Sequence, residues 1–534
     1  MKKNNFLEGA LIATIAIFFS KFLGIIYVIP FYSIVGTQGG ALYGYAYNIY
    51  NLFLIISTAG IPLAISKLTS EYNALNKIKE KEYLFKSTKT IILIFSIFCF
   101  LLCFIFAPNI AKLIIGDIKG GNTIKDISIV IRCVSFAILF VPSLSVIRGY
   151  LQGHRFIKPS SFSQVIEQIV RILVIIIGSY LTLKVFNLGL TNAVGVAVFG
   201  ATAGAITAYL YLINKAKKIK NTGNTNDLNK NEKKEIIKKI IYYSIPFIII
   251  NIANALYNTT DMILLNKGLE LLNYEGKIIE NVSSVFTTWG HKLNAIITSI
   301  ATGVAISLIP SISENRAKND NLAINDKLNK ILLIFLYIAL PLAIFMSIFS
   351  KQIWTIFYGS NFYGPIIFKF LVITAAFDAL YIMLNNAMQG LNKTKLIYIS
   401  VISGLIANLC LDLPFMFLFQ RLGIYPFYGA ILATIIGYTI SLIIPLVTLK
   451  NEFKISYTKT LNKIPKLIGI FLILIFISII YRGIINNVYN RLLLILLISI
   501  IGIVTLIIYY FLSKYELKEI FGKDIKDILR KKRD

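Results

Sequence analysis

Charged residues are scarce in this chain of 534 residues. Asp, Glu, Lys and Arg make up 15% of the sequence, whereas soluble domains contain about 25%. Hydrophobic residues account for 57%. So few charges cannot cover a water-exposed surface of this size, which excludes an ordinary soluble globular protein. The composition predicts an all-α polytopic membrane protein whose apolar surface faces lipid.

Histidine and cysteine are rarer still. The chain has two histidines, His154 and His291, and its four cysteines lie in apolar runs without metal-ligand spacing. These numbers argue against a catalytic zinc site and a disulfide framework, so no metal is expected. A Walker A loop is missing, which argues against ATP hydrolysis by this chain. Without a Ser/His or Cys/His constellation of usable spacing, we expect neither an enzyme nor a cofactor.

Acidic residues are outnumbered by basic ones, 25 against 54, and the formal net charge is +29. Most of the basic residues lie in alternate connections between apolar runs, such as residues 67–89 and 215–239. This positive-inside pattern predicts that both termini are cytoplasmic. It explains the charge without nucleic acid and places the basic connections against anionic lipid headgroups.

Long apolar runs are abundant. Fourteen of them are long enough to cross a bilayer as helices of about 20 residues. They lie near residues 7–35, 42–66, 88–115, 127–150, 161–183, 190–213, 236–266, 282–312, 328–350, 365–388, 394–419, 426–449, 463–482 and 490–513. We therefore predict fourteen transmembrane helices.

An internal repeat relates the first six helices to the next six. Residues 60–71 (GIPLAISKLTSE) match residues 303–314 (GVAISLIPSISE), and residues 150–153 (YLQG) match residues 387–390 (AMQG). Six helices separate the copies, so both copies have the same orientation. Two parallel six-helix lobes are a transporter plan with the substrate bound between them.

The repeat and the composition divide the chain into five predicted parts. A polar stretch rich in Lys and Asn separates the lobes, and a basic tail follows the last helix pair. The parts are an N-terminal lobe (1–213), a cytoplasmic linker (214–235), a C-terminal lobe (236–450), a helix pair (451–513) and a cytoplasmic tail (514–534).

Ionisable side chains inside the predicted spans are candidates for function, because a charge facing lipid costs several kcal/mol. Lys21 lies roughly 20 Å along the first helix and is assigned to a substrate cavity. Glu167 and Arg171 are four residues apart on the fifth helix and can pair on one face, either as a structural pair or in the cavity. Arg148 and Arg155, at the cytoplasmic end of the fourth helix, either meet entering phosphates or act as positive-inside anchors.

A polar stripe follows the seventh helix. Asn251, Asn254, Asn258 and Asp261 are spaced by three, four and three residues, so they share one face. Such a stripe can join helices through interhelical hydrogen bonds, but its length and its terminal carboxylate favour a cavity wall. Further cavity candidates on the second and eighth helices are Asn51, His291 and Lys292. Tyrosines expected in the aromatic belt at the membrane interface are Tyr43, Tyr45, Tyr47 and Tyr50.

Two of the repeat motifs carry a family resemblance. Residues 60–67 (GIPLAISK) and 148–154 (RGYLQGH), with the two lobes and the extra helix pair, resemble the polysaccharide transporter branch of the MOP flippase superfamily. Within that branch the chain is most similar to the stage V sporulation protein B and YtgP group of MurJ-type lipid II flippases. The resemblance extends over essentially the whole chain.

The resemblance implies a cationic cavity between the lobes that carries lipid II from the inner to the outer leaflet by alternating access, for peptidoglycan synthesis. Helices 13 and 14 would form a groove for the lipid tail, and the protein is expected to be a monomer. MurJ-type proteins use basic residues on helices 1, 2 and 8. Lys21 and Lys292 match two of these positions approximately, whereas the second helix here has no internal basic residue. The driving force would be an ion gradient, the membrane potential or consumption of the product outside.

Other functions stay open from the sequence. The chain could carry another undecaprenyl-linked polysaccharide repeat unit. It could also be a cation-coupled multidrug exporter of the sister MATE branch, although that branch has twelve helices and needs cavity carboxylates. A third possibility is a non-transporting scaffold for assembly of the cell wall or spore coat.

Overall fold

The computed structural model describes residues 19–20, 23–24, 26–58, 60–116, 121–154, 156–217, 228–485 and 491–521. Within these ranges the chain is helical and contains no strand, so the predicted all-α class is confirmed. The chain divides into two compact units, Met1–Trp289 and Gly290–Asp534.

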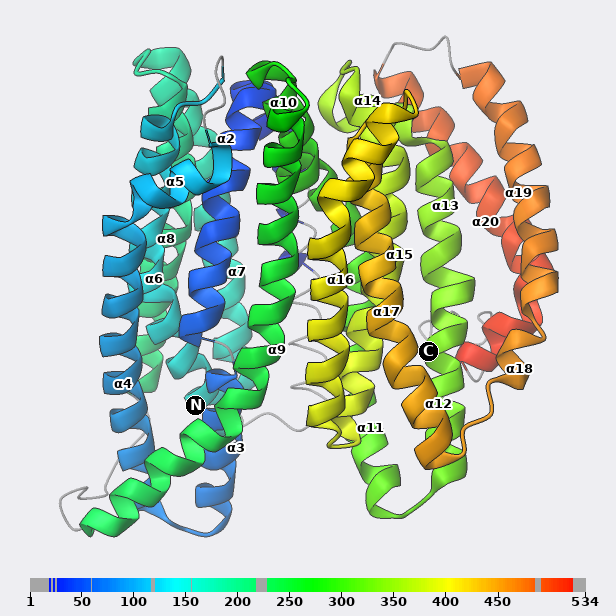
Figure 1. Cartoon of the computed structure of the whole chain (residues 1–534). Coiled ribbons are helices and arrows are strands. Elements are labelled where there is room, and N and C mark those ends of the chain that lie inside the picture. The colour runs from blue at the N-terminus through cyan, green and yellow to red at the C-terminus, as the bar shows by residue number, and fades with distance from the viewer. Residues whose placement is uncertain are drawn as a thin grey trace. The chain divides into compact units, whose positions relative to one another are not determined.

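The first unit is built mainly from long helices (Figure 1). Its helices are α2 (Val28–Thr58), α3 (Ile61–Ala74), α4 (Ile78–Ile105), α5 (Ala107–Ile115), α6 (Ile124–Gly153), α7 (Ile157–Leu173), α8 (Leu190–Ala216), α9 (Lys230–Leu271) and α10 (Gly276–Ser284). In the described part of this unit, helices are continued by the π-helical turns η1 (Val174–Gly178), η2 (Leu181–Val185) and η4 (Val285–Trp289).

The second unit continues directly from η4. Its helices are α11 (Gly290–Ala317), α12 (Asn321–Ile334), α13 (Leu340–Ile348), α14 (Ser350–Tyr358), α15 (Tyr363–Gly390), α16 (Thr394–Arg421), α17 (Phe427–Phe453), α18 (Thr458–Leu461), α19 (Ile464–Ile485) and α20 (Arg491–Phe521). The π-helical turn η5 (Phe335–Ala339) joins α12 to α13.

Ten helices in the described ranges are long and apolar enough to cross a membrane. They coincide with ten of the fourteen predicted spans, and the multi-pass membrane class is confirmed. Their outer faces expose large apolar side chains, such as Ile94 on α4, Phe476 on α19 and Phe511 on α20. The other four predicted spans (7–35, 42–66, 236–266 and 282–312) are not among the ten, so the number fourteen and the cytoplasmic termini stay predictions.

The boundary between the compact units falls at Trp289, whereas the sequence predicts a boundary between lobes at 214–235. In the structure α9, α10 and η4 pack with the first unit, mainly against α2. The compact units are defined by contacts between helices, whereas the predicted lobes are defined by the sequence repeat. The two divisions need not coincide, so the lobe boundaries stay a prediction.

Two glycines account for the conformation and packing of residues 60–67 at the start of α3. Gly60 has a φ of 75°, a conformation that favours glycine, and it ends the long helix before Pro62 starts the next. Gly149 lies against the backbone of Pro62, where a Cβ would overlap it. The Ser70 hydroxyl then donates to the Gly153 carbonyl at 2.9 Å. Residues 60–67 and 148–154, far apart in sequence, therefore form one packed junction.

The second unit repeats this arrangement. α11 and α15 pack along each other, as α3 and α6 do, and Arg316 at the end of α11 donates to the Leu391 carbonyl just after α15. α6 and α15 are also the most buried of the candidate spans. The corresponding helices of the predicted repeat thus form the centre of each unit.

Candidate functional site

Three charged side chains meet inside the first unit. Glu167 accepts a hydrogen bond from Arg148 at 2.9 Å and another from Arg171 at 2.6 Å, with a different carboxylate oxygen for each. Arg148 lies near the end of α6, whereas Glu167 and Arg171 are one turn apart on α7. The side chains are only 12–16% exposed, so these charges are largely withdrawn from solvent.

Polar and aromatic groups complete the surroundings of this Arg148–Glu167–Arg171 cluster. The Arg148 Nε donates to the Ser163 hydroxyl at 2.9 Å. Arg171 also donates to the Tyr47 hydroxyl on α2 at 3.4 Å, and the Tyr47 ring stacks on Tyr43 with 5.3 Å between centroids. Three helices therefore fix the positions of the two guanidinium groups.

The cluster holds one excess positive charge, because two guanidinium groups share a single carboxylate. Burying ions is costly unless they are paired, and here both arginines keep a carboxylate partner. The remaining charge favours an anion. Guanidinium groups bind phosphate through two parallel hydrogen bonds, so the cluster is chemically suited to a phosphate group.

The structure confirms the pairing of Glu167 with Arg171 that their spacing predicts. It also brings Arg148 into the same cluster, although the sequence placed this arginine at a separate cytoplasmic position. No spacing rule links Arg148 to Glu167, because the contact is between two helices. The only hint in the sequence of the Arg148–Glu167 pair is that a charged side chain inside a predicted span needs a partner of opposite charge.

The tyrosines of α2 correct one prediction. They were expected in an aromatic belt at the membrane surface, but Tyr43, Tyr45 and Tyr50 are at most 3% exposed. Tyr47 contacts Arg171, as described above. The α2 tyrosines therefore face the interior of the first unit, where Tyr47 reaches Arg171.

The other predicted cavity residues are distributed over both units. Asn51 on α2 and Asp261 on α9 are half-buried, and Asn258 on α9 is exposed. On α11, His291 is exposed and Lys292 is half-buried. Candidates whose side chains lie outside the described part of the chain are Lys21, Arg155, Asn251 and Asn254. The shared cavity of these residues stays a prediction.

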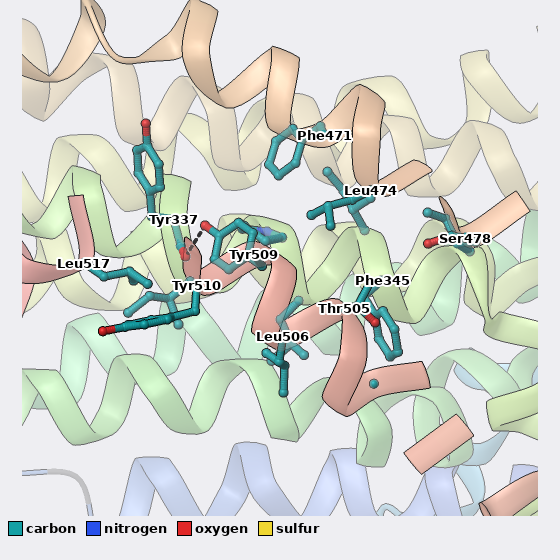
Figure 2. Close-up of a pocket in the computed structure, with 16 residues that line it drawn as sticks. Tyr337, Phe345, Phe471, Leu474, Ser478, Thr505, Leu506, Tyr509, Tyr510 and Leu517 are labelled. Carbon is teal, nitrogen blue, oxygen red and sulfur yellow. Dashed lines mark hydrogen bonds between the residues drawn. The ribbon is translucent and has the colours of Figure 1, made fainter. Parts of the chain in front are cut away.

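An apolar groove lies in the second unit, where the last two helices meet the continuous segment of α12, η5 and α13 (Figure 2). Its volume is about 400 Å³, within the range of small-molecule pockets. Phe345 and Pro341 line one side, and Leu474 and Leu506 line the other. The Tyr509 hydroxyl is turned away to donate to the Tyr337 carbonyl at 2.7 Å, so the wall of the groove is almost entirely apolar.

Two ion pairs near this groove connect the start of α19 to the last part of α20. Lys466 contacts Glu516 at 2.7 Å, and Lys463 contacts Glu519. Elsewhere, among the residues with described positions, no group of three His, Cys, Asp or Glu side chains could hold a metal ion.

Comparison with known proteins defines the class first. Residues 6–270 match the family described as Polysaccharide biosynthesis protein, and residues 286–413 match the MatE family. A solved lipid II flippase MurJ in an inward closed conformation shares the fold, with a TM-score of 0.65 and 19% identity over 95% of this chain and 100% of that one. An inward-facing MATE multidrug transporter gives a TM-score of 0.64 and 15% identity over 81% of this chain and 94% of that one. The protein is a membrane transporter of the MOP superfamily.

Individual relatives define the family. The lipid II flippase MurJ of Bacillus subtilis (strain 168) is 34% identical over 84% of both chains. Stage V sporulation protein B of the same organism is 24% identical over 86% of this chain and 88% of the relative. The chain therefore belongs to the MurJ family and is a multi-pass flippase of the cell membrane.

Proposed function

We propose that this flippase carries lipid II, an undecaprenyl-diphosphate sugar precursor, from the inner to the outer leaflet by alternating access for peptidoglycan synthesis. The observation that carries the proposal is the Arg148–Glu167–Arg171 cluster, with its excess positive charge inside a membrane-spanning unit. The 34% identity with the lipid II flippase MurJ supports the same substrate.

Phosphate chemistry makes the cluster suitable for this task. A diphosphate cannot cross hydrocarbon unaided, because its charge must stay solvated or paired. Each arginine of the cluster has donors beyond those that reach Glu167, since a guanidinium carries five N–H groups. A phosphate can therefore be bound without breaking the two pairs that keep the arginines in place.

The remaining cavity wall is proposed to come from both predicted lobes of a fourteen-helix protein with cytoplasmic termini. Its residues would be Lys21, Asn51, Asn251, Asn254, Asn258, Asp261, His291 and Lys292, with Arg155 near the cytoplasmic opening. An ion gradient or the membrane potential would supply the driving force, and the potential provides about 2.3 kcal/mol per charge per 100 mV.

The apolar groove of the second unit is proposed to hold part of the undecaprenyl tail. Its walls offer hydrocarbon contacts from α13, α19 and α20, and the hydroxyl groups of Thr505 and Tyr509 donate to backbone carbonyls. Burial of apolar surface contributes about 25 cal/mol per Å², so the tail would anchor the substrate while the headgroup moves.

Two other cargoes remain as alternatives. A different undecaprenyl-linked glycan has the same diphosphate and tail, so the cluster and the groove would serve it equally well. A cationic drug, the cargo of a MATE-type exporter, is supported by the MatE match of residues 286–413. The excess positive charge of the cluster has the wrong sign for such a drug.

The decisive experiment is rescue of lipid II flipping in cells depleted of their native lipid II flippase. We expect rescue of growth and of surface-accessible lipid II by the wild-type chain. If this chain instead restores only another glycan in a strain that lacks the corresponding flippase, the first alternative is correct. Export of cationic dyes without either rescue would support the MATE alternative.

A further inference from the structure

Glu280 is a buried carboxylate that the proposed transport site does not use. It lies on α10, ahead of the predicted span 282–312 and therefore at the predicted outer end of the molecule. The residue is 4% exposed. One carboxylate oxygen accepts a hydrogen bond from the backbone N–H of Asn122, in the connection that leads into α6.

This hydrogen bond belongs to a larger contact between α9, α10 and η4 on one side and α2 and the α5–α6 connection on the other. The Asn122 side chain donates to the Gln38 carbonyl at 3.1 Å. The Asn266 side chain donates to the Ile114 carbonyl at 3.1 Å, and the Thr288 hydroxyl donates to the Gly40 carbonyl at 2.8 Å. We call this set of hydrogen bonds the outer contact. Figure 1 shows α5 and α10 at the same end of the first unit.

The fit around Glu280 is close. An ideal Cβ on Gly121 would lie within 2.8 Å of the Glu280 carboxylate, so residue 121 packs directly against this carboxylate. Alternating access requires the outer end of a flippase to open and close. An opened outer contact would expose Glu280 to water, whereas the closed contact buries it.

The groups that face Glu280 do not neutralise an ionised carboxylate. α2 contributes the buried phenol of Tyr45, and α6 contributes the Asp126 carboxylate. On α9, Lys267 pairs with Glu270 at 2.9 Å. Burial raises the pKa of the Glu280 carboxyl to about 7; Asp126 adds to this effect, and the hydrogen bonds from Asn122 oppose it.

We propose that Glu280 is a proton-binding site, and that a proton taken up there from the outside favours the closed outer contact. The proposal rests on alternating access, but not on the identity of the transported lipid. Protonation would favour the return of the flippase to its outside-closed state after product release, and the proton would leave to the outside when the contact opens again.

The direction of the pH effect follows from the two states. In the open state Glu280 is hydrated and titrates near its ordinary pKa of 4.5, whereas the closed state holds its pKa near 7. Closure is therefore strongest below about pH 4.5. It weakens as the pH rises from 4.5 to 7 and changes little above that, because the carboxylate is then ionised in both states.

A cysteine reporter tests the proposal in the full chain in cells or right-side-out vesicles. Thr288, 3% exposed in the closed contact, is replaced by Cys after the four native cysteines are changed to Ala. A membrane-impermeant maleimide then reports opening. The measured quantity is the labelling rate of this reporter chain divided by the rate of the same chain with Glu280→Gln. We expect this ratio to rise about tenfold or more from pH 5 to pH 8, because one unit of difference in pKa corresponds to a factor of ten.

Dividing by the Glu280→Gln rate removes the ordinary pH dependence of thiol reactivity. Glutamine mimics the protonated acid, so this variant should label slowly at every pH. Glu275→Gln, at an exposed glutamate just before α10, is the matched control and should keep the wild-type pH dependence. A ratio independent of pH, or fast labelling of Glu280→Gln at all pH values, would overturn the proposal. Either result would leave the lipid II proposal untouched, because the labelling needs no substrate.

Discussion

The charged cluster of the first unit and the apolar groove of the second unit are stabilised in opposite ways. The cluster depends on three side chains whose atoms meet within 3 Å, and loss of the shared Glu167 carboxylate would leave two largely buried guanidinium groups without their ion-pair partner. The groove depends on shape and on many weak contacts, so no single residue dominates it. A lipid-linked substrate needs both properties, because its phosphates require specific donors and its tail requires only apolar volume.

The largest expected effect is at Arg171. Arg171→Ala removes the excess charge of the cluster but leaves the Arg148–Glu167 pair, so the protein should still fold. We expect flipping to fall about 100-fold, since truncating one member of a buried charge pair costs about 2–5 kcal/mol of binding. Arg171→Lys should recover part of the activity, because lysine keeps the charge without the planar fork. Flipping is measured in the rescue assay at matched expression.

Arg132→Ala provides the control for this comparison. Arg132 lies on α6, where it donates to the Phe104 carbonyl at 3.3 Å and covers the Phe104 ring, away from the cluster. We expect little change in flipping. Equal activity of the Arg171→Ala and Arg132→Ala variants would refute the assignment of the cluster to the substrate.

A smaller effect is expected from filling the groove. Gly502 on α20 lines the groove, and a Cβ there would lie 3.8 Å from Phe345, the nearest atom outside its own helix. Gly502→Phe places a ring in the space proposed for the tail and should reduce flipping about tenfold, the equivalent of 1.4 kcal/mol. A Cβ at Gly469 on α19 would have no atom within 4 Å, so Gly469→Phe serves as the control. If both variants flip equally, the groove does not hold the tail.

The smallest effect is expected from Tyr509→Phe. The change removes one hydrogen bond to the Tyr337 carbonyl and keeps the ring in the groove wall. Stability should fall by about 1 kcal/mol, seen as a lower apparent Tm in detergent, while flipping changes less than about threefold. Tyr515→Phe, at a side chain that is 79% exposed, should leave the apparent Tm unchanged. A larger loss of flipping than from Gly502→Phe would show that this hydroxyl has a direct role.

Local spacing predicted some of the cluster and missed the rest. Glu167 and Arg171 are one helical turn apart, so their pairing follows from helix geometry alone. Arg148 is 19 residues before Glu167, and their contact exists because α6 and α7 pack side by side. The tyrosines of α2 were misassigned for a related reason. Composition suggests a membrane belt for tyrosine, but it does not reveal that Arg171 on a neighbouring helix donates a hydrogen bond to the Tyr47 hydroxyl.

The sequence by itself determined the membrane class, most of the spans and the repeat. These follow from hydropathy, from alternation of basic connections and from motifs such as residues 60–67 and 148–154, all of which are local properties. Only the tertiary structure decided which buried charges meet and that α9 and α10 pack with the first unit. It also decided that the Glu280 carboxylate accepts a hydrogen bond from the Asn122 backbone N–H. The physical reason is that a charge in an apolar helix must find a partner, but the partner is fixed by packing between helices.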